Sequence, residues 1–270
     1  KPNMGSIILD GKNITGRKTI DINKAGIART FQNIRLFSNM TVLDNVKVGL
    51  HNSTKSNLFA SVTHGFGYHK AERQAKERAL ELLSVFHMQD LANAQAGSLP
   101  YGLQRRLEIA RALATAPKIL ICDEPVSALD VSVQASILNL LKQLQQKLGI
   151  SYIFIAHDMS VVQHISDRIL VMYRGRVVES GSYEEICSRP RHPYTVHLID
   201  AIPVADPSVP CSPLRCAQTT AESETGCTYY PRCVNRKDDC LKFNYQQTEL
   251  SPGHICSCLY PESTYRKGEE

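Results

Sequence analysis

Two apolar segments separated by one amphipathic segment constrain the fold more than any other feature of this sequence. Residues 118–122 (KILIC) and 152–156 (YIFIA) are short and almost continuously apolar, and residues 132–148 between them repeat apolar side chains at helical spacing. Apolar strands joined by a helix are typical of a parallel sheet that is covered on both faces. The sequence therefore predicts an α/β fold around a parallel sheet.

Further segments extend this core in both directions along the chain. Residues 6–9 run into an Asp-Gly turn, which predicts an edge strand. Helical periodicity predicts helices over residues 71–88 and 103–114. Residues 169–172 predict another strand, which turns at Arg174–Gly175 into a hairpin.

Composition excludes some classes of protein. A chain of 270 residues with 43% hydrophobic and 21% charged residues is long enough for one large domain or two smaller ones. It contains no run of 18 apolar residues and does not start with the layout of a signal peptide, so we expect it in the cytoplasm. A net charge of +5 without a basic stripe, and the absence of Trp, argue against a nucleic-acid partner.

Two carboxylates directly follow the first apolar strand. Asp123 and Glu124 give the layout of a nucleotide-hydrolysing site, in which the first carboxylate holds Mg²⁺ and the second polarises the attacking water. Taken alone, the same pair is equally typical of a helix N-terminus with favourable capping and dipole contacts.

Other polar residues lie at suitable points along the chain. Gln32 follows a strand in ARTFQN, and His157 follows the apolar segment SYIFIA. Between them, the turn from Leu99 to Gly102 opens a helix whose first N–H groups form an anion site. Each residue alone is as compatible with a structural role, so only their joint order supports a functional one.

In this joint order the residues resemble the motifs of the ATPase subunits of ABC transporters. The resemblance implies a Q-loop glutamine, a signature motif, a Walker B pair, a D-loop and a switch histidine. In the same order, these motifs correspond to Gln32, to Leu99–Leu103, to Asp123 and Glu124, to Ser127–Asp130, and to His157.

For the site, the resemblance implies ATP and Mg²⁺ as ligands. Glu124 is then expected to orient the attacking water and His157 to contact the γ-phosphate, as the catalytic pair. Asp123 is expected to support Mg²⁺, and Gln32 to sense the metal and the membrane subunits. Further contacts with nucleotide across a pair of subunits are expected from Leu99, Gly102, Ser127 and Asp130.

The resemblance also implies a domain organisation. We expect an incomplete ABC-type P-loop ATPase core in residues 1–185, with a helical subdomain over about residues 33–112. Residues 186–270, in which the helical and strand periodicities fade, are expected to form a loop-rich, cysteine-containing C-terminal extension.

The sequence departs from the family at two places. The phosphate-binding pattern G-x-x-x-x-G-K-[ST] (Walker A) occurs nowhere in the 270 residues, which predicts poor ATP binding by this chain alone. We therefore expect a fragment of a longer ATPase, with a degenerate subunit as the alternative. In the signature motif, Pro100 supplies neither a hydroxyl nor an N–H.

The two halves of the chain resemble different branches of the family. Residues 26–46 and the stretch QRRLEIAR resemble ATPases of branched-chain amino-acid importers. Residues from 126 onward, above all RPRHPYT at 189–195, resemble ATPases of oligopeptide and dipeptide importers. We favour peptides as the transported compounds, with branched-chain amino acids as the alternative.

The resemblance implies partners as well. A second ATPase subunit, identical or different, would complete the nucleotide sites, and membrane-spanning permease subunits would carry the substrate. An extracytoplasmic substrate-binding protein would act indirectly, and the ATPase would lie peripherally on the cytoplasmic face of the membrane. Two further hypotheses are a P-loop-free, non-enzymatic docking module and a nucleic-acid-associated ABC protein, of which the second is less favoured.

Cysteines gather in the last third of the chain. Cys227, Cys233 and Cys240 are separated by five and six residues, and Cys258 or Cys256 supplies a fourth thiol. Thiolates suit zinc or an iron–sulfur cluster, but these separations are wider than in a zinc-finger knuckle. The resemblance to peptide-importer ATPases implies a [4Fe–4S] cluster with Cys258 as fourth ligand, and the alternative is a set of reduced thiols without metal.

Overall fold

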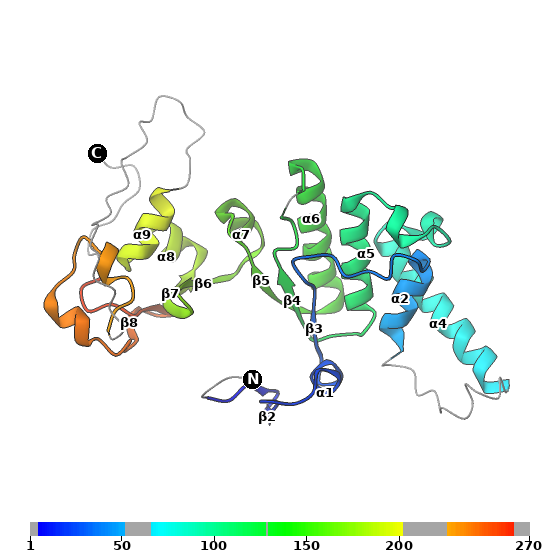
Figure 1. Ribbon diagram of the computed structural model, residues 1–270, viewed down its shortest axis with the longest axis horizontal. Helices are drawn as coiled ribbons and strands as arrows, with labels where there is room; N and C mark the ends of the chain where they lie inside the picture. The colour runs from blue at the N-terminus through cyan, green and yellow to red at the C-terminus, as the bar shows by residue number, and fades with distance from the viewer. Residues whose placement is uncertain (1–4, 52–65, 128, 202–225, 262–270) are drawn as a thin grey trace. The chain divides into compact units, whose positions relative to one another are not determined.

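The computed structural model describes residues 5–51, 66–127, 129–201 and 226–261 (Figure 1). The chain divides into two units, Lys1–Val161 and Val162–Glu270, which are described separately. In the described part of the chain, no helix combines the length and the apolar character needed to cross a membrane.

A three-stranded parallel sheet lies in the first unit. Its strands β3 (Ile27–Arg29), β4 (Ile119–Asp123) and β5 (Ser151–Ile155) are ordered β3-β4-β5. Helix α6 (Val131–Leu148) joins β4 to β5, so the predicted strand–helix–strand unit is confirmed (Figure 1). Because the strands are parallel, their carboxyl ends meet at one edge of the sheet.

Local interactions fix both ends of α6. Asp130 caps the helix, since its side chain accepts a hydrogen bond from the Val133 N–H at 3.2 Å. Gly149 ends it with a φ of 63°, and its N–H donates to the Gln145 carbonyl.

The expectation that both faces of the sheet are covered is wrong for β5. Successive side chains of a strand point to opposite faces. On one face, Tyr152 donates its hydroxyl to the Leu141 carbonyl of α6 at 3.0 Å. On the other face, Ile153 and Ile155 are 51% and 45% exposed, because the residues that the structure describes leave that face of the strand uncovered.

A small hairpin precedes the sheet. Strands β1 (Ile8–Leu9) and β2 (Lys12–Asn13) pair antiparallel, and helix α1 (Thr19–Lys24) follows them. Asp10 and Gly11 form the turn with φ values of 48° and 73°, which is the geometry that favours Asp-Gly in two-residue hairpins. The predicted strand and turn are therefore confirmed.

Among the residues that the structure describes, three helices form the helical part of the first unit. They are α2 (Val42–Leu50), α4 (Phe66–Val85) and α5 (Tyr101–Leu113), and α2 packs against both others (Figure 1). Short 3₁₀ turns at Gln89–Leu91 and Ala96–Ser98 connect α4 to α5. The helices predicted over residues 71–88 and 103–114 are confirmed, although both begin a few residues earlier. The fully buried side chains here include Val42, Val46, Leu83, Phe86, Leu107 and Ile109.

Thr41 and Gly49 show why α2 lies where it does. Thr41 caps the helix by accepting the Asp44 N–H at 3.0 Å. At Gly49, an added Cβ would lie 2.4 Å from the Arg111 carbonyl oxygen, so α2 and α5 approach closely only because this residue has no side chain.

The second unit is built on an antiparallel sheet. A hairpin of β6 (Arg168–Tyr173) and β7 (Arg176–Ser182) turns at Arg174 and Gly175, as predicted. Strand β9 (His254–Cys256) pairs with β7, and β8 (Thr248–Ser251) pairs with β9, which gives the order β6-β7-β9-β8.

Helices precede and follow this hairpin along the chain. Helix α7 (Met159–Ile165) contains the division between the units, and α8 (Tyr183–Ser188) and α9 (Pro193–Asp200) follow β7. Short 3₁₀ helices at Tyr230–Arg232 and Asp238–Lys242 carry cysteine-rich segments. The buried core joins the hairpin to α8 through Ile169, Val171, Val178 and Ile186.

The division into units falls earlier than the predicted start of the extension at residue 186. The physical reason is strand pairing, since β9 from the extension continues the ladder of β7. The hairpin therefore groups with the extension in the structure. The domain boundary at residue 186, which was drawn where the helical and strand periodicities fade, stays a prediction.

Candidate functional site

Three of the predicted site residues meet at the carboxyl edge of the parallel sheet. Gln32 follows β3, Glu124 follows β4 and His157 follows β5. Gln32 Nε2 donates to Glu124 Oε2 at 3.2 Å, and His157 Nδ1 lies 3.4 Å from Glu124 Oε1. The Glu124 carboxylate thus contacts the residues that follow the two neighbouring strands, β3 and β5.

Asp123 takes part in an ion pair that sequence reasoning missed. The Arg29 guanidinium lies 2.7 Å from Asp123 Oδ2. Arg29 ends β3, which pairs in parallel with β4, so a basic residue at that strand end was the available signal. Carboxylate and amide oxygens are suitable Mg²⁺ ligands, and Asp123 and Gln32 offer both at this edge.

The Glu124 backbone adopts an uncommon conformation. Its φ is 44°, in the left-handed region that costs a side-chain-bearing residue roughly 1–3 kcal/mol. Its N–H donates to the Ile155 carbonyl at 3.0 Å, and its own carbonyl accepts from Ser127 Oγ at 2.9 Å. These two hydrogen bonds fix the backbone of the turn after β4 and so hold the Glu124 carboxylate in place.

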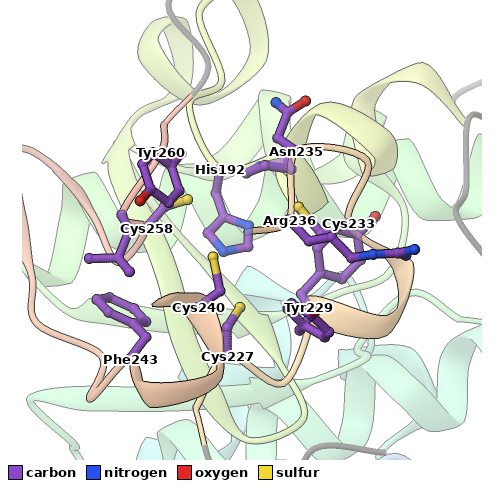
Figure 2. A pocket seen from close by; sticks show the side chains of 13 residues that line it. His192, Cys227, Tyr229, Cys233, Asn235, Arg236, Cys240, Phe243, Cys258 and Tyr260 are labelled. Atoms are coloured by element: carbon purple, nitrogen blue, oxygen red, sulfur yellow. The ribbon is translucent and has the colours of Figure 1, made fainter. Parts of the chain in front are cut away.

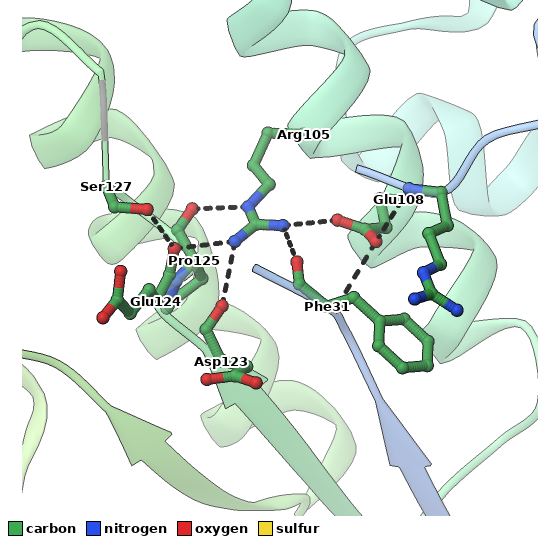
Figure 3. Close-up of polar contacts among 8 residues, drawn as sticks. Phe31, Arg105, Glu108, Asp123, Glu124, Pro125 and Ser127 are labelled. Carbon is green, nitrogen blue, oxygen red and sulfur yellow. Dashed lines mark hydrogen bonds and ion pairs between the residues drawn. The ribbon is translucent and has the colours of Figure 1, made fainter. Parts of the chain in front are cut away.

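Arg105 of α5 adds the strongest support to this turn. Its guanidinium donates to the carbonyl oxygens of Asp123 at 3.1 Å, Glu124 at 2.7 Å and Pro125 at 2.8 Å. Another N–H donates to the Phe31 carbonyl at 2.6 Å, next to Gln32. Figure 3 shows this guanidinium between the segment after β4 and the segment after β3.

Glu108, one turn further along α5, compensates the buried charge of Arg105. Its Oε2 accepts from Arg105 Nη1 at 2.5 Å, and both side chains are 2% exposed. Its Oε1 also accepts the backbone N–H groups of Phe31 and Arg35, each at 3.4 Å (Figure 3). Sequence reasoning missed this pair, although charges three residues apart on a helix were a signal.

The remaining predicted nucleotide contacts lie at the starts of α5 and α6. Leu99 accepts the Gln104 side-chain N–H on its carbonyl at 2.8 Å, and Pro100 provides no side-chain cap for α5. At Gly102 an added Cβ would lie 2.9 Å from Val133 Cγ1, which explains the glycine. Hydrogen bonding from the Ser132 hydroxyl lowers the pKa of Asp130. Leu99 and Asp130 thus bond within the starts of their own helices, and Gly102 lies against α6.

A second site candidate lies in the second unit. Cys227, Cys233, Cys240 and Cys258 line one cavity, hereafter the cysteine cavity (Figure 2). Cys256 is not among its lining residues. All the cysteines that the structure describes are present as thiols.

Burial and neighbouring charge both act on these thiols. Burial, with a smaller contribution from negative charge on Cys233, Cys227 and Cys240, raises the pKa of Cys258 to about 12. Burial and the charge of Cys240 likewise raise the pKa of Cys227. Without a cation the cavity therefore favours protonated thiols, and thiolates there need a compensating positive charge.

The cysteine cavity does not converge on one point. Among the described residues, no three His, Cys, Asp or Glu side chains come close enough together to hold a single metal ion. Zinc requires sulfur ligands at about 2.3 Å from one centre. A four-iron cluster would take its four thiolates at different iron atoms, so it does not require them to meet at one centre.

Arg236 and His192 also line this cavity, and neither was predicted as part of a site. Arg236 carries a buried Nη1 that finds no hydrogen-bond partner within the described residues. An orphaned cationic N–H beside thiols fits an anionic occupant. His192 is 1% exposed.

Two family models match this sequence. One, described as "ABC transporter", matches residues 1–127. The other, described as "Oligopeptide/dipeptide transporter, C-terminal region", matches residues 178–240. The first range holds Gln32, Asp123 and Glu124, and the second holds three of the four cysteines of the cavity.

Curated relatives agree with both matches. The oligopeptide transport ATP-binding protein OppF of Haemophilus influenzae is 42% identical over 194 residues, which cover 70% of this chain and 58% of the relative. OppF of Escherichia coli (strain K12) is 44% identical over 200 residues, which cover 71% and 60%. The chain thus spans less than two thirds of the length of these relatives.

Solved structures share the fold. A nucleotide-free ATP-binding cassette from an ABC transporter matches with a TM-score of 0.57 and 30% identity, covering 68% of this chain and 72% of that one. The ADP conformation of MJ1267, an ATP-binding cassette of an ABC transporter, matches with a TM-score of 0.60 and 27% identity, covering 74% and 78%.

The parallel sheet of the first unit belongs to the fold that these ATP-binding cassettes share. This chain belongs to the family of ABC transporter ATP-binding proteins. Within that family it is similar to the oligopeptide transport proteins OppF, including their C-terminal region.

Proposed function

We propose that this chain forms part of the ATP-hydrolysing subunit of an ABC importer for oligopeptides or dipeptides. The observation that carries the proposal is the position of Glu124, whose carboxylate touches both Gln32 and His157 at the carboxyl edge of the sheet. A carboxylate held between an amide and an imidazole is placed to orient a water molecule for attack.

The roles of the other residues at this edge follow from their chemistry. Asp123 and Gln32 would hold Mg²⁺, which when bound neutralises charge that develops on the phosphates. Arg29 has to leave Asp123 Oδ2 as the metal approaches, since both compete for that oxygen. His157 Nδ1 would turn from Glu124 towards the γ-phosphate.

The starts of α5 and α6 would serve a second ATPase subunit. Leu99 and Gly102 open α5, whose first N–H groups favour an anion, although Pro100 removes one donor. Ser127 and Asp130 lie between the turn after β4, which contains Glu124, and α6. A pair of such subunits would place the signature motif of one against the nucleotide of the other.

Peptides are the proposed transported class, because the C-terminal region resembles that of peptide transporters and the similar relatives are oligopeptide transport proteins. Branched-chain amino acids remain the alternative. The proposed partners are membrane-spanning permease subunits, with an extracytoplasmic substrate-binding protein acting indirectly. The ATPase would lie peripherally at the cytoplasmic face of the membrane.

A [4Fe–4S] cluster is the proposed occupant of the cysteine cavity, with Cys227, Cys233, Cys240 and Cys258 as ligands. Supporting observations are the four thiols around one cavity and the orphaned N–H of Arg236. Such a cluster supplies a one-electron redox couple and ties four chain segments together. Zinc is the alternative metal that the same four thiols would bind.

Nucleotide binding tests the ATPase proposal. Because no G-x-x-x-x-G-K-[ST] pattern occurs in this sequence, Mg-ATP binding is measured for this chain and for a version with a P-loop segment joined ahead of it. Both carry Glu124→Gln to prevent turnover. Binding only with the P-loop segment supports the proposal. Binding by neither version rejects it in favour of a non-enzymatic docking module.

Anaerobic reconstitution with ferrous iron and sulfide tests the cluster. About four iron atoms per chain and a charge-transfer absorption are expected. Cys258→Ser should lower the iron content, whereas Cys256→Ser, outside the cavity, should not. Equal loss in both variants, or uptake of zinc alone, contradicts the proposed cluster.

A further inference from the structure

His192 belongs to the stretch RPRHPYT and lies beside the thiols of the cysteine cavity. Its side chain is 1% exposed and lines the cavity together with Cys227, Cys233, Cys240 and Cys258. Figure 2 shows its imidazole among the cysteine side chains. A buried ring in that position needs a reason beyond packing, because imidazole nitrogens are polar.

One nitrogen of this ring has a structural role. His192 is the N-cap of α9, and its Nδ1 accepts the Tyr194 N–H at 3.1 Å. Shorter side chains such as Ser, Asp or Asn ordinarily supply this cap. The capping role therefore explains Nδ1 but leaves Nε2, which a shorter cap would not bring into the cavity.

The hydrogen bond to Nδ1 also determines the tautomer. An Nδ1 that accepts a hydrogen bond carries no proton, so the ring is in a neutral form. A neutral imidazole that accepts on Nδ1 carries its proton on Nε2. Nε2 is then a hydrogen-bond donor and lacks the lone pair that a metal ligand needs.

The buried carboxylate of Glu179 on β7 fixes this arrangement. It accepts the backbone N–H groups of Arg191 at 2.7 Å and His192 at 2.9 Å. Oε1, the oxygen that accepts the Arg191 N–H, also lies 2.7 Å from His254 Nε2 of β9. Strand β9 leads within two residues to Cys258, so one carboxylate holds both the backbone of His192 and the segment of the fourth thiol.

We propose that His192 donates its Nε2–H to a sulfur atom of the cluster in the cysteine cavity, and that Glu179 positions it for this contact. The inference rests on the proposed cluster and assigns His192 as a positioning and tuning residue rather than a ligand. Hydrogen bonds to cluster sulfur stabilise the reduced form, which carries one more negative charge, and so raise the reduction potential.

The test compares the reduction potential of the reconstituted cluster in the full chain and in His192→Asn. Asparagine keeps the N-cap but is too short to donate into the cavity. Loss of the donor should shift the ratio of reduced to oxidised cluster about tenfold towards the oxidised form, which corresponds to a fall of about 59 mV. His164→Asn, the same substitution at an exposed residue of α7 outside the cavity lining, is the matched control and should leave the potential unchanged.

A measurement on the unsubstituted protein keeps the inference testable if His192→Asn does not hold a cluster. With ¹⁵N-labelled histidine, pulsed EPR of the reduced cluster should show coupling to a histidine nitrogen through the N–H···S contact. Absence of that coupling, or an unchanged potential in His192→Asn, overturns the role of His192 while the cluster stands. Absence of iron uptake in the unsubstituted chain instead rejects the cluster itself and the contact with it.

Discussion

The carboxyl edge of the parallel sheet and the cysteine cavity are organised in opposite ways. At the sheet edge the polar groups already satisfy one another, since Glu124 meets Gln32 and His157, and Arg105 binds the carbonyls beneath it. In the cavity, burial and the negative charge of neighbouring thiolates raise the pKa of Cys258 and the pKa of Cys227. The first site is preorganised by the chain, whereas the second requires a cation to become a set of thiolates.

The largest expected effect is catalytic and concerns Glu124. In the version that carries a P-loop segment, Glu124→Gln should lower the ATP hydrolysis rate roughly 100- to 10,000-fold, because the amide no longer polarises water. Mg-ATP affinity should change little, as measured by equilibrium binding. A variant that hydrolyses ATP at an undiminished rate would show that Glu124 is not the catalytic carboxylate.

Arg105→Leu should be the most damaging substitution for stability. It leaves Glu108 as a buried carboxylate without its cationic partner and removes one donor from each of four carbonyls, so the free energy of unfolding should fall by about 3–5 kcal/mol. Urea denaturation measures this loss.

The double variant Arg105→Leu/Glu108→Leu is the matched control, because it removes both charges together. It should recover part of the lost stability. If the double variant is no more stable than Arg105→Leu, the loss comes from the hydrogen bonds to the turn rather than from the unpaired carboxylate.

Alkaline pH should weaken the first unit through Cys122 of β4. Burial raises the pKa of this thiol from 9.0 to about 12, so the folded state keeps its proton where the unfolded chain releases it. Stability should therefore be fully present below pH 9 and fall as the pH rises towards 12, by about 1 kcal/mol at pH 10. Urea denaturation of the wild type and of Cys122→Ala should show their stability difference narrowing over this range. A constant difference would contradict the raised pKa.

The smallest expected effect lies in the cysteine cavity without metal. Because Cys258 is only partly buried and its thiol is protonated there, Cys258→Ser should change the unfolding free energy of the metal-free chain by no more than about 1 kcal/mol. Thermal unfolding before and after reconstitution measures this. The reconstituted wild type should gain stability that Cys258→Ser lacks, and a large loss already without metal would remove the contrast between the two sites.

Sequence reasoning was most accurate where the signal is local. The strand–helix–strand unit around α6, the Asp10-Gly11 turn and the hairpin at Arg174–Gly175 were all predicted, because apolar spacing and turn residues act over a few positions. Gln32, Glu124 and His157 were each placed after a predicted strand, as the structure has them, but their mutual contacts were not predicted. Their chemical roles remain predictions.

The supporting contacts were not predictable in the same way. Arg105 binds backbone carbonyls 18 to 74 residues away, and carbonyl acceptors leave no trace in the identity of the side chains. The exposed Ile153 and Ile155 of β5 were likewise missed, since an apolar run does not reveal which face of a strand is covered. His192 belongs to RPRHPYT, the stretch that carried the resemblance to peptide-importer ATPases. Its position beside the thiols, however, depends on Glu179 and on the fold.

The pairing of β9 with β7 has a consequence for how the second unit forms. His254 reaches Glu179 across 75 residues of chain, so the ladder closes only after a long loop has been brought together. Contacts of this range slow folding, and during synthesis they wait until the ribosome has released residues beyond 256. Until then β7 presents an unpaired edge, and nascent chains are most exposed to mispairing with one another over that interval.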